Sequence, residues 1–168
     1  MKVAIFGAGT MGRGIAQVFA ANGHTALMYA SSIASAQRHR DELDASLQKR
    51  VAKGKMPQGA KDALMANVFV EEESAAADAD LVIECIAEEM GPKKELFHRL
   101  DELCKPETVF ASNTSTLSIT EMGNGLKHPL IGMHFFNPVP SMKLIEVIRG
   151  VNTPHETFDF VYKLAQDI

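Results

Sequence analysis

Short apolar runs alternate with longer amphipathic stretches along the chain. Lys2–Phe6 predicts a buried strand, and the spacing of Ile15, Val18 and Phe19 predicts a helix that ends at Asn22-Gly23. Four more strands are predicted, at Thr25–Tyr29, Val68–Val70, Leu81–Ile86 and Val109–Ala111. Strands that alternate with helices in this way indicate an α/β fold with a Rossmann-like, doubly wound, mostly parallel sheet.

The region between the second and third predicted strands is unusually long. We expect one helical region over Ile33–Ala66. Within it, Arg38–Lys55 is mostly polar, and its apolar stripe consists only of Leu43, Leu47 and Val51. Such a narrow apolar face covers little of a sheet, so we expect this helical excursion to project outward. Two shorter helices are expected over Lys93–Leu103 and Leu117–Met122.

From Leu130 the pattern changes to strand, turn, strand. The first strand ends at His134, and the second, Leu144–Ile148, is apolar except for Glu146. Pro138 and Pro140 predict a stiff turn that brings the two strands side by side as an additional, smaller sheet edge.

Glu146 interrupts what looks like a buried strand. A buried carboxylate needs a cationic or hydrogen-bonding partner, and His134 is the candidate. An imidazole held by a carboxylate is a general acid–base unit. The alternative is that His134 is an ordinary core histidine and that Glu146 lies on an exposed strand edge.

The first strand runs directly into a glycine-rich turn that matches the dinucleotide-binding fingerprint. Gly7 permits the tight turn, Gly9 lets a pyrophosphate approach the backbone, and Gly12 allows close packing of helix and strand. Thr10 and Met11 lie at the helix N-terminus, whose free N–H groups and positive dipole attract phosphate. A glycine-rich turn without a ligand is the alternative.

Composition fits one domain. The chain has 168 residues, of which 46% are hydrophobic and 23% charged, with a net charge of -4. It lacks an apolar run near the roughly 20 residues of a membrane span, so we expect a cytoplasmic protein without a membrane partner. Mild acidity argues against nucleic acid as a partner. Cys85 and Cys104 show no spacing typical of a disulfide or a metal site.

A basic cluster lies at the end of the projecting helical region. It contains Lys49, Arg50, Lys53 and Lys55. The cluster is either a phosphate-binding site or a solvated basic face.

Four segments, taken in order, resemble the L-3-hydroxyacyl-CoA dehydrogenase family, in particular its bacterial 3-hydroxybutyryl-CoA dehydrogenases. They are GAGTMGRGIAQVFAANGH, DLVIECIAE, KPETVFASNTSTLSIT and IGMHFFNPVPSMKLIEVIRG. The resemblance covers the whole chain. It implies NAD(P)-linked interconversion of short-chain (S)-3-hydroxyacyl-CoA and 3-oxoacyl-CoA, in fatty-acid or butyrate metabolism.

The resemblance also implies residue roles. His134 would exchange the proton of the 3-hydroxyl, Glu146 would orient the imidazole, and Ser115 would contact the substrate oxygen beside the nicotinamide. The implied cofactor contacts beyond the glycine-rich turn are Glu88, Lys93, Ser115 and Asn137. Ser46 and Lys53 match positions that meet the coenzyme A portion.

Two departures from the family stand out. Where the family has an aspartate for the adenosine ribose, this chain has Ala30, followed by Ser31 and Ser32. With Arg38 and Arg40 downstream, we expect relaxed selectivity for NAD, so that NADP is not excluded.

The second departure is length, because family members continue beyond Ile168 into a helical domain that forms a dimer. We therefore expect residues 1–168 to be the dinucleotide-binding domain, with the helical dimerisation domain absent and cofactor binding retained better than turnover. The full-length form is expected to be a homo-oligomer. Two other functions remain open at this point, a dehydrogenase of free hydroxy or sugar acids and a non-catalytic dinucleotide-binding module.

Overall fold

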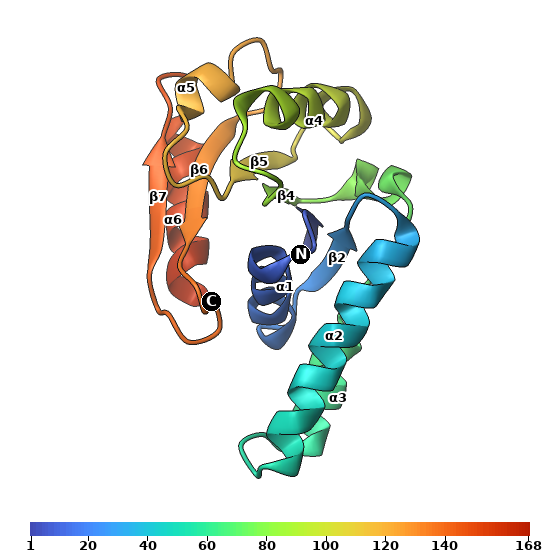
Figure 1. The fold of residues 1–168 in the computed structure, drawn as a ribbon. Helices are drawn as coiled ribbons and strands as arrows, with labels where there is room; N and C mark the ends of the chain where they lie inside the picture. The colour runs from blue at the N-terminus through green and yellow to red at the C-terminus, as the bar shows by residue number, and fades with distance from the viewer.

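Seven strands form one sheet with helices on both faces (Figure 1). The computed structural model describes all residues, 1–168. In space the strand order is β3-β2-β1-β4-β5-β6-β7. The strands are β1 (Lys2–Phe6), β2 (Thr25–Tyr29), β3 (Val68–Phe69), β4 (Leu81–Glu84), β5 (Val109–Ser112), β6 (Leu130–Phe135) and β7 (Ile145–Arg149). All neighbouring pairs are parallel except β6 and β7, which confirms the predicted doubly wound, mostly parallel sheet.

Two apolar cores lie on the two faces of the sheet. The helices are α1 (Thr10–Ala21), α2 (Ile33–Ala52), α3 (Gln58–Met65), α4 (Met90–Leu103), α5 (Ile119–Met122) and α6 (His155–Asp167), with a 3₁₀-helix, η1 (Glu73–Asp78). Buried side chains of α1 and α6 belong to one core, and those of α4, α5 and η1 belong to the other. None of these helices combines the length and the apolarity needed to span a bilayer.

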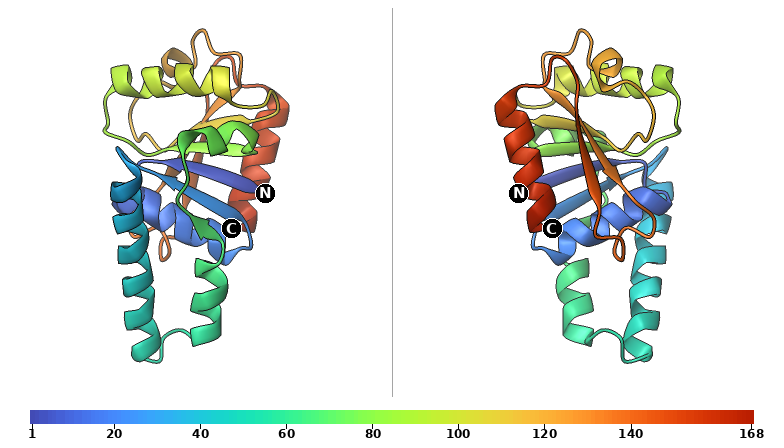
Figure 2. Two further views of the ribbon diagram at one scale, coloured as in Figure 1. Left: turned by 90° about the vertical axis from the view of Figure 1, so that its right-hand side faces the viewer. Right: turned by 90° about the vertical axis from the view of Figure 1, so that its left-hand side faces the viewer.

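Helices α2 and α3 form an antiparallel arm that extends beyond the sheet (Figures 1 and 2). The predicted projection is confirmed, but the expected single helical region is two helices. The break follows from Gly54, whose φ of 67° lies in the left-handed region, and from Pro57 before the first turn of α3. Leu43 and Leu47 of the arm are buried in the same core as Leu64 of α3.

The strands after Leu130 differ from the prediction in their setting. They pair as expected, but they continue the main sheet, since β6 lies beside β5. Of the two positions left open for Glu146, a buried strand and an exposed strand edge, the structure shows the exposed edge, because its side chain is 54% exposed. Strand β7 is one of the two edge strands of the sheet, and only one of its faces is partly covered. Neither α6 nor η1 was predicted from the pattern.

Candidate active site

The turn between β1 and α1 needs its glycines for reasons of space. Gly7 has a φ of 103°, which other residues rarely adopt, and a Cβ there would collide with the carbonyl of Cys85. A Cβ on Gly12 would overlap the carbonyl oxygen of Gly7. The turn therefore holds the N-terminus of α1 directly against the carboxyl ends of β1 and β4.

The N-terminus of α1 offers unused hydrogen-bond donors. No protein group accepts a hydrogen bond from the backbone N–H of Thr10, Met11 or Gly12, and Gly9 provides no side-chain cap. Gly9 has an ordinary φ of -63°, and a Cβ at this position would meet nothing within 4 Å. The protein itself therefore does not require glycine there, whereas close approach of a pyrophosphate does. The residues present fit a dinucleotide.

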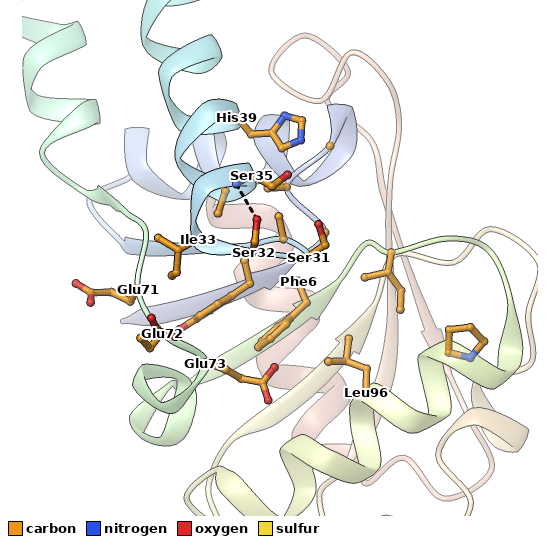
Figure 3. A pocket seen from close by; sticks show the side chains of 18 of the residues that line it. Phe6, Ser31, Ser32, Ile33, Ser35, His39, Glu71, Glu72, Glu73 and Leu96 are labelled. Atoms are coloured by element: carbon orange, nitrogen blue, oxygen red, sulfur yellow. Dashed lines mark hydrogen bonds between the residues drawn. The ribbon is translucent and has the colours of Figure 1, made fainter.

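A cleft of about 630 Å³ opens beside this turn (Figure 3). It is lined by the turn itself, by the residues after β2, by the segment after β3 and by one side of α4. Ala30 and Ser31 line it, and Ser32 caps α2 by accepting a hydrogen bond from the N–H of Ser35 at 3.1 Å. Its position at the carboxyl ends of β1 and β2 is that of the adenosine half of a dinucleotide.

One expected contributor to this region is engaged elsewhere. The guanidinium of Arg40 donates hydrogen bonds to the carbonyl oxygens of Val68 at 2.9 Å and Met65 at 3.4 Å. The Arg40 side chain is therefore held by backbone carbonyl groups, at Met65 and Val68. Arg38 is exposed and lies 3.4 Å from the hydroxyl of Ser35.

His134 and Glu146 lie directly opposite each other on β6 and β7. The Nδ1 atom of His134 is 2.8 Å from Oε2 of Glu146. Because a carboxylate only accepts hydrogen bonds, Nδ1 is the donor, and Nε2, which has no protein partner, is the ring nitrogen that is free to contact a ligand. The imidazole is 17% exposed, and the ring of Phe136 packs against it with a centroid separation of 4.5 Å. The predicted contact between His134 and Glu146 is present, and the carboxylate of Glu146 is exposed to solvent.

The loop after β5 is tied to the strand that carries His134. Asn113 accepts a hydrogen bond from the N–H of Phe135 at 2.8 Å through its side-chain oxygen. Two residues further along, Ser115 is exposed and its hydroxyl makes no hydrogen bond within the protein. Asn113 thus fixes the position of Ser115 relative to His134, a role that sequence reasoning missed because nothing local in the sequence marks it.

A buried ion pair lies beneath this loop. Glu84 at the end of β4 is fully buried, and Lys93 of α4 has a side chain only 1% exposed. The Lys93 ammonium is 2.5 Å from Glu84, and a second Glu84 oxygen accepts a hydrogen bond from Ser112 at 2.6 Å. Lys93 also contacts the carbonyl of Ile86 and the carboxylate of Glu88. Its three N–H groups therefore have partners inside the protein.

Glu88 connects this ion pair to the loop after β5. One of its oxygens lies 3.1 Å from Lys93, and the other accepts hydrogen bonds from the Thr114 hydroxyl and the N–H of Ser115. Burial alone would raise the pKa of Glu88, but the hydrogen bonds from Thr114 and Lys93 and the charge of Lys93 outweigh burial and lower it. Its side chain is still 43% exposed, so the carboxylate borders solvent.

The loop between β6 and β7 rests on helix α1. A Cβ added to Gly14 would lie 2.8 Å from the Cβ of Val139, which is itself 5% exposed. Asn137, two residues earlier, is exposed and its side chain makes no hydrogen bond within the protein. Gly14 therefore lets the loop with Asn137 approach the dinucleotide turn, a second contact that sequence reasoning missed.

The arm carries the expected basic cluster. Ser46, Lys49, Arg50 and Lys53 follow the spacing of one helical face, and all four are exposed. None of the three cations makes an ion pair. Lys53 follows the last residue of α2, and Lys55 lies beyond it in the turn before α3. This surface has free positive charge, as an anion site requires.

Comparison with known proteins agrees with this geometry. Residues 2–168 match the family described as "3-hydroxyacyl-CoA dehydrogenase, NAD binding domain". The chain is 45% identical to 3-hydroxybutyryl-CoA dehydrogenase of Clostridioides difficile, covering 100% of this chain and 61% of that protein. It is 42% identical to mitochondrial hydroxyacyl-coenzyme A dehydrogenase of Rattus norvegicus, covering 94% and 53%.

A solved structure shows the same fold. The crystal structure of 3-hydroxybutyryl-CoA dehydrogenase from Escherichia coli K12 superimposes with a TM-score of 0.95 at 39% identity, covering 99% of this chain and 36% of that one. The chain thus spans about three fifths of the length of the first curated relative. The family match spans residues 2–168 and agrees with the glycine turn and the free N-terminus of α1. We conclude that this chain belongs to the NAD-binding domain family of the 3-hydroxyacyl-CoA dehydrogenases.

Proposed function

We propose that the chain provides the NAD-binding and acid–base part of an enzyme that interconverts (S)-3-hydroxyacyl-CoA and 3-oxoacyl-CoA. The observation that carries this proposal is the contact between His134 and Glu146 across β6 and β7. His134 lies near the carboxyl end of β6, and the dinucleotide turn follows the carboxyl end of β1, so both lie at the same end of the sheet. Relatives named 3-hydroxybutyryl-CoA dehydrogenase support a short acyl chain.

In the proposed reaction His134 moves the proton. Its Nε2 atom takes the proton of the 3-hydroxyl while the hydride leaves C3, and it returns the proton in the reductive direction. Glu146 holds the proton on Nδ1 and stabilises the imidazolium that forms. NAD, when bound, supplies the hydride acceptor. No further acid or base is needed to balance this step.

Three neighbouring residues complete the proposed site. The free hydroxyl of Ser115 would bind the substrate oxygen, and the free amide of Asn137 would border the nicotinamide end. Glu88 would meet the ribose next to it. We assign Lys93 a positioning role, because its ammonium is buried and acts on this surface through Glu88.

The arm is the proposed contact for the coenzyme A portion of the substrate. Ser46 and Lys53 share a helical face with Lys49 and Arg50, so a hydroxyl and three cations are available for a phosphate group. A dimer of the complete enzyme and a cytoplasmic location stay predictions.

The test is turnover with acetoacetyl-CoA and NADH by the full-length form, measured together with NADH affinity. His134→Gln is expected to lower kcat by about 10²–10⁴-fold and to leave NADH affinity unchanged. His155→Gln, an exposed histidine of α6, is the matched control. Unchanged turnover in His134→Gln would contradict the role assigned to His134. NADH binding without any turnover in the unmodified protein would instead favour a non-catalytic dinucleotide-binding module.

A related substrate class has some structural support. A diketoreductase structure superimposes with a TM-score of 0.84 at 27% identity, covering 99% of this chain and 61% of that one. A dehydrogenase of free oxo acids would reduce acetoacetate as well as its CoA thioester. An acyl-CoA dehydrogenase would instead prefer acetoacetyl-CoA strongly over acetoacetate, and Lys53→Gln would reduce that preference.

A further inference from the structure

The end of β2 lacks the carboxylate that sets cofactor selectivity in many dinucleotide-binding folds. In such folds an acidic residue at this place binds the ribose hydroxyls and repels the 2′-phosphate of NADP. This chain has Ala30, Ser31 and Ser32 here. A preference for NAD over NADP therefore requires negative charge from another part of the cleft.

The neighbouring strand brings three carboxylates to the same place. Strand β3 runs parallel to β2, with Leu27 opposite Phe69. Glu71 follows the end of β3 by two residues, and its charge is close enough to Tyr29 to raise the pKa of that hydroxyl. Glu71, Glu72 and Glu73 all line the cleft that Ala30 lines, on the segment after β3 and across from Ser31 and Ser32 (Figure 3).

Two of these carboxylates are uncompensated. Glu73 forms a two-point ion pair with Arg99, at 2.7 and 3.1 Å. Arg99 is the only lysine or arginine that lines the cleft, so this pair uses the cation available there. Glu71 and Glu72 are exposed and form no ion pair, and Glu95 adds another carboxylate to the lining. The cleft is therefore negative on the side that faces Ala30.

A buried polar atom in the same cleft independently points to a ligand. Tyr29 lines the cleft, is 6% exposed and stacks on Phe6, yet its hydroxyl has no hydrogen-bond partner. Burial raises the pKa of Tyr29, and the nearby charges of Glu71 and Glu73 raise it further, so the hydroxyl stays a neutral donor. Buried polar groups are rarely left unpaired, and a bound molecule would supply the acceptor.

We propose that Glu71 and Glu72 replace the missing carboxylate at position 30 and determine a preference for NAD over NADP. Their field, rather than direct contact, acts on the 2′-phosphate, which would lie within about one Debye length of them. This inference rests on the proposed function, in that the cleft binds the adenosine half of the cofactor. It replaces the expectation of relaxed selectivity that Ala30 alone suggested.

The experiment compares dissociation constants for NADH and NADPH by calorimetric titration of the 168-residue chain. The double variant Glu71→Gln/Glu72→Gln is expected to narrow the ratio of the two constants by about tenfold, roughly threefold for each carboxylate. Glu121→Gln/Glu156→Gln removes the same charge from exposed positions outside the cleft and is expected to leave the ratio unchanged. Introducing Ala30→Asp into the cleft double variant is expected to restore the preference.

Salt provides a second readout for the same chain. The preference of the unmodified protein is expected to shrink in 1 M salt, where the Debye length falls to about 3 Å. Equal constants for both dinucleotides in the unmodified chain, or a ratio that the cleft variants leave unchanged, would overturn this inference while the NAD-binding assignment stands. Failure to bind either dinucleotide would overturn both.

Discussion

The buried pair of Glu84 and Lys93 leads to a prediction about stability. Lys93→Met removes the cation and keeps most of the side-chain volume, so Glu84, at 0% exposure, loses its counter-ion. Breaking a buried pair in this way costs about 3–5 kcal/mol. Glu84 keeps its hydrogen bonds from Ser112 and the N–H of Ile86, so we expect the lower end, about 3 kcal/mol.

Urea unfolding of the chain measures this loss. For a domain of this size, about 3 kcal/mol corresponds to a fall in Tm of roughly 6–12 °C. Lys94→Met changes the adjacent, partly exposed lysine and is expected to cost less than about 0.5 kcal/mol. Adding Glu84→Gln to Lys93→Met removes both charges, and the double variant is expected to recover most of the lost stability.

The same variants separate stability from positioning. Glu88, the proposed ribose contact, loses its ion pair with Lys93 in Lys93→Met and in the double variant. NADH affinity is therefore expected to stay reduced in the double variant even though its stability recovers. The reasoning would be refuted if Lys93→Met cost under about 1 kcal/mol, or if the double variant were less stable than either single one.

Three further outcomes follow from the site. Glu146→Gln is expected to lower turnover of acetoacetyl-CoA by about tenfold to a hundredfold with NADH affinity unchanged, less than in a buried triad because Glu146 is 54% exposed; equal turnover would contradict its orienting role. Lys53→Gln is expected to raise KM for acetoacetyl-CoA about threefold, more at low salt, with kcat unchanged; an effect on NADH affinity instead would place the cofactor on the arm. Because the pKa of Glu88 is lowered in the folded protein, its contribution to stability is fully present above pH 4.5, the ordinary pKa of glutamate, and is lost as the pH falls through the lower folded pKa. Glu88→Gln is therefore expected to flatten the pH dependence of the urea midpoint below pH 4.5.

Much of the fold could be predicted because local patterns determine it. The dinucleotide turn and the strand pair of His134 and Glu146 are visible in a few adjacent residues. The sequence left open whether Glu146 is buried or exposed, because an apolar strand at the edge of a sheet has the same pattern as a central one. Helix α6 did leave a signal, since Val161 and Leu164 are buried at helical spacing.

Other features of the site depend on contacts between distant segments. The burial of Lys93 follows from acceptors on β4 and on the loop before α4, and a charged residue in a helix gives no sign of them. Glu71 and Tyr29 come to the same cleft because β2 pairs with β3, a strand of only two residues. Such short pairings have almost no sequence signature.

The contact between Gly14 and Val139 sets the spacing between helix α1 and the loop that follows His134. Helix α1 presents its N-terminus to the dinucleotide and, one turn later, supports the loop that leads from His134 to β7. A single methyl group at position 14 would act as a wedge between these two parts and move the acid–base pair away from the nicotinamide end. Hydride transfer tolerates very little extra separation of the reacting atoms. The absence of a side chain at Gly14 therefore keeps the acid–base pair at the distance from the nicotinamide end that the proposed chemistry needs.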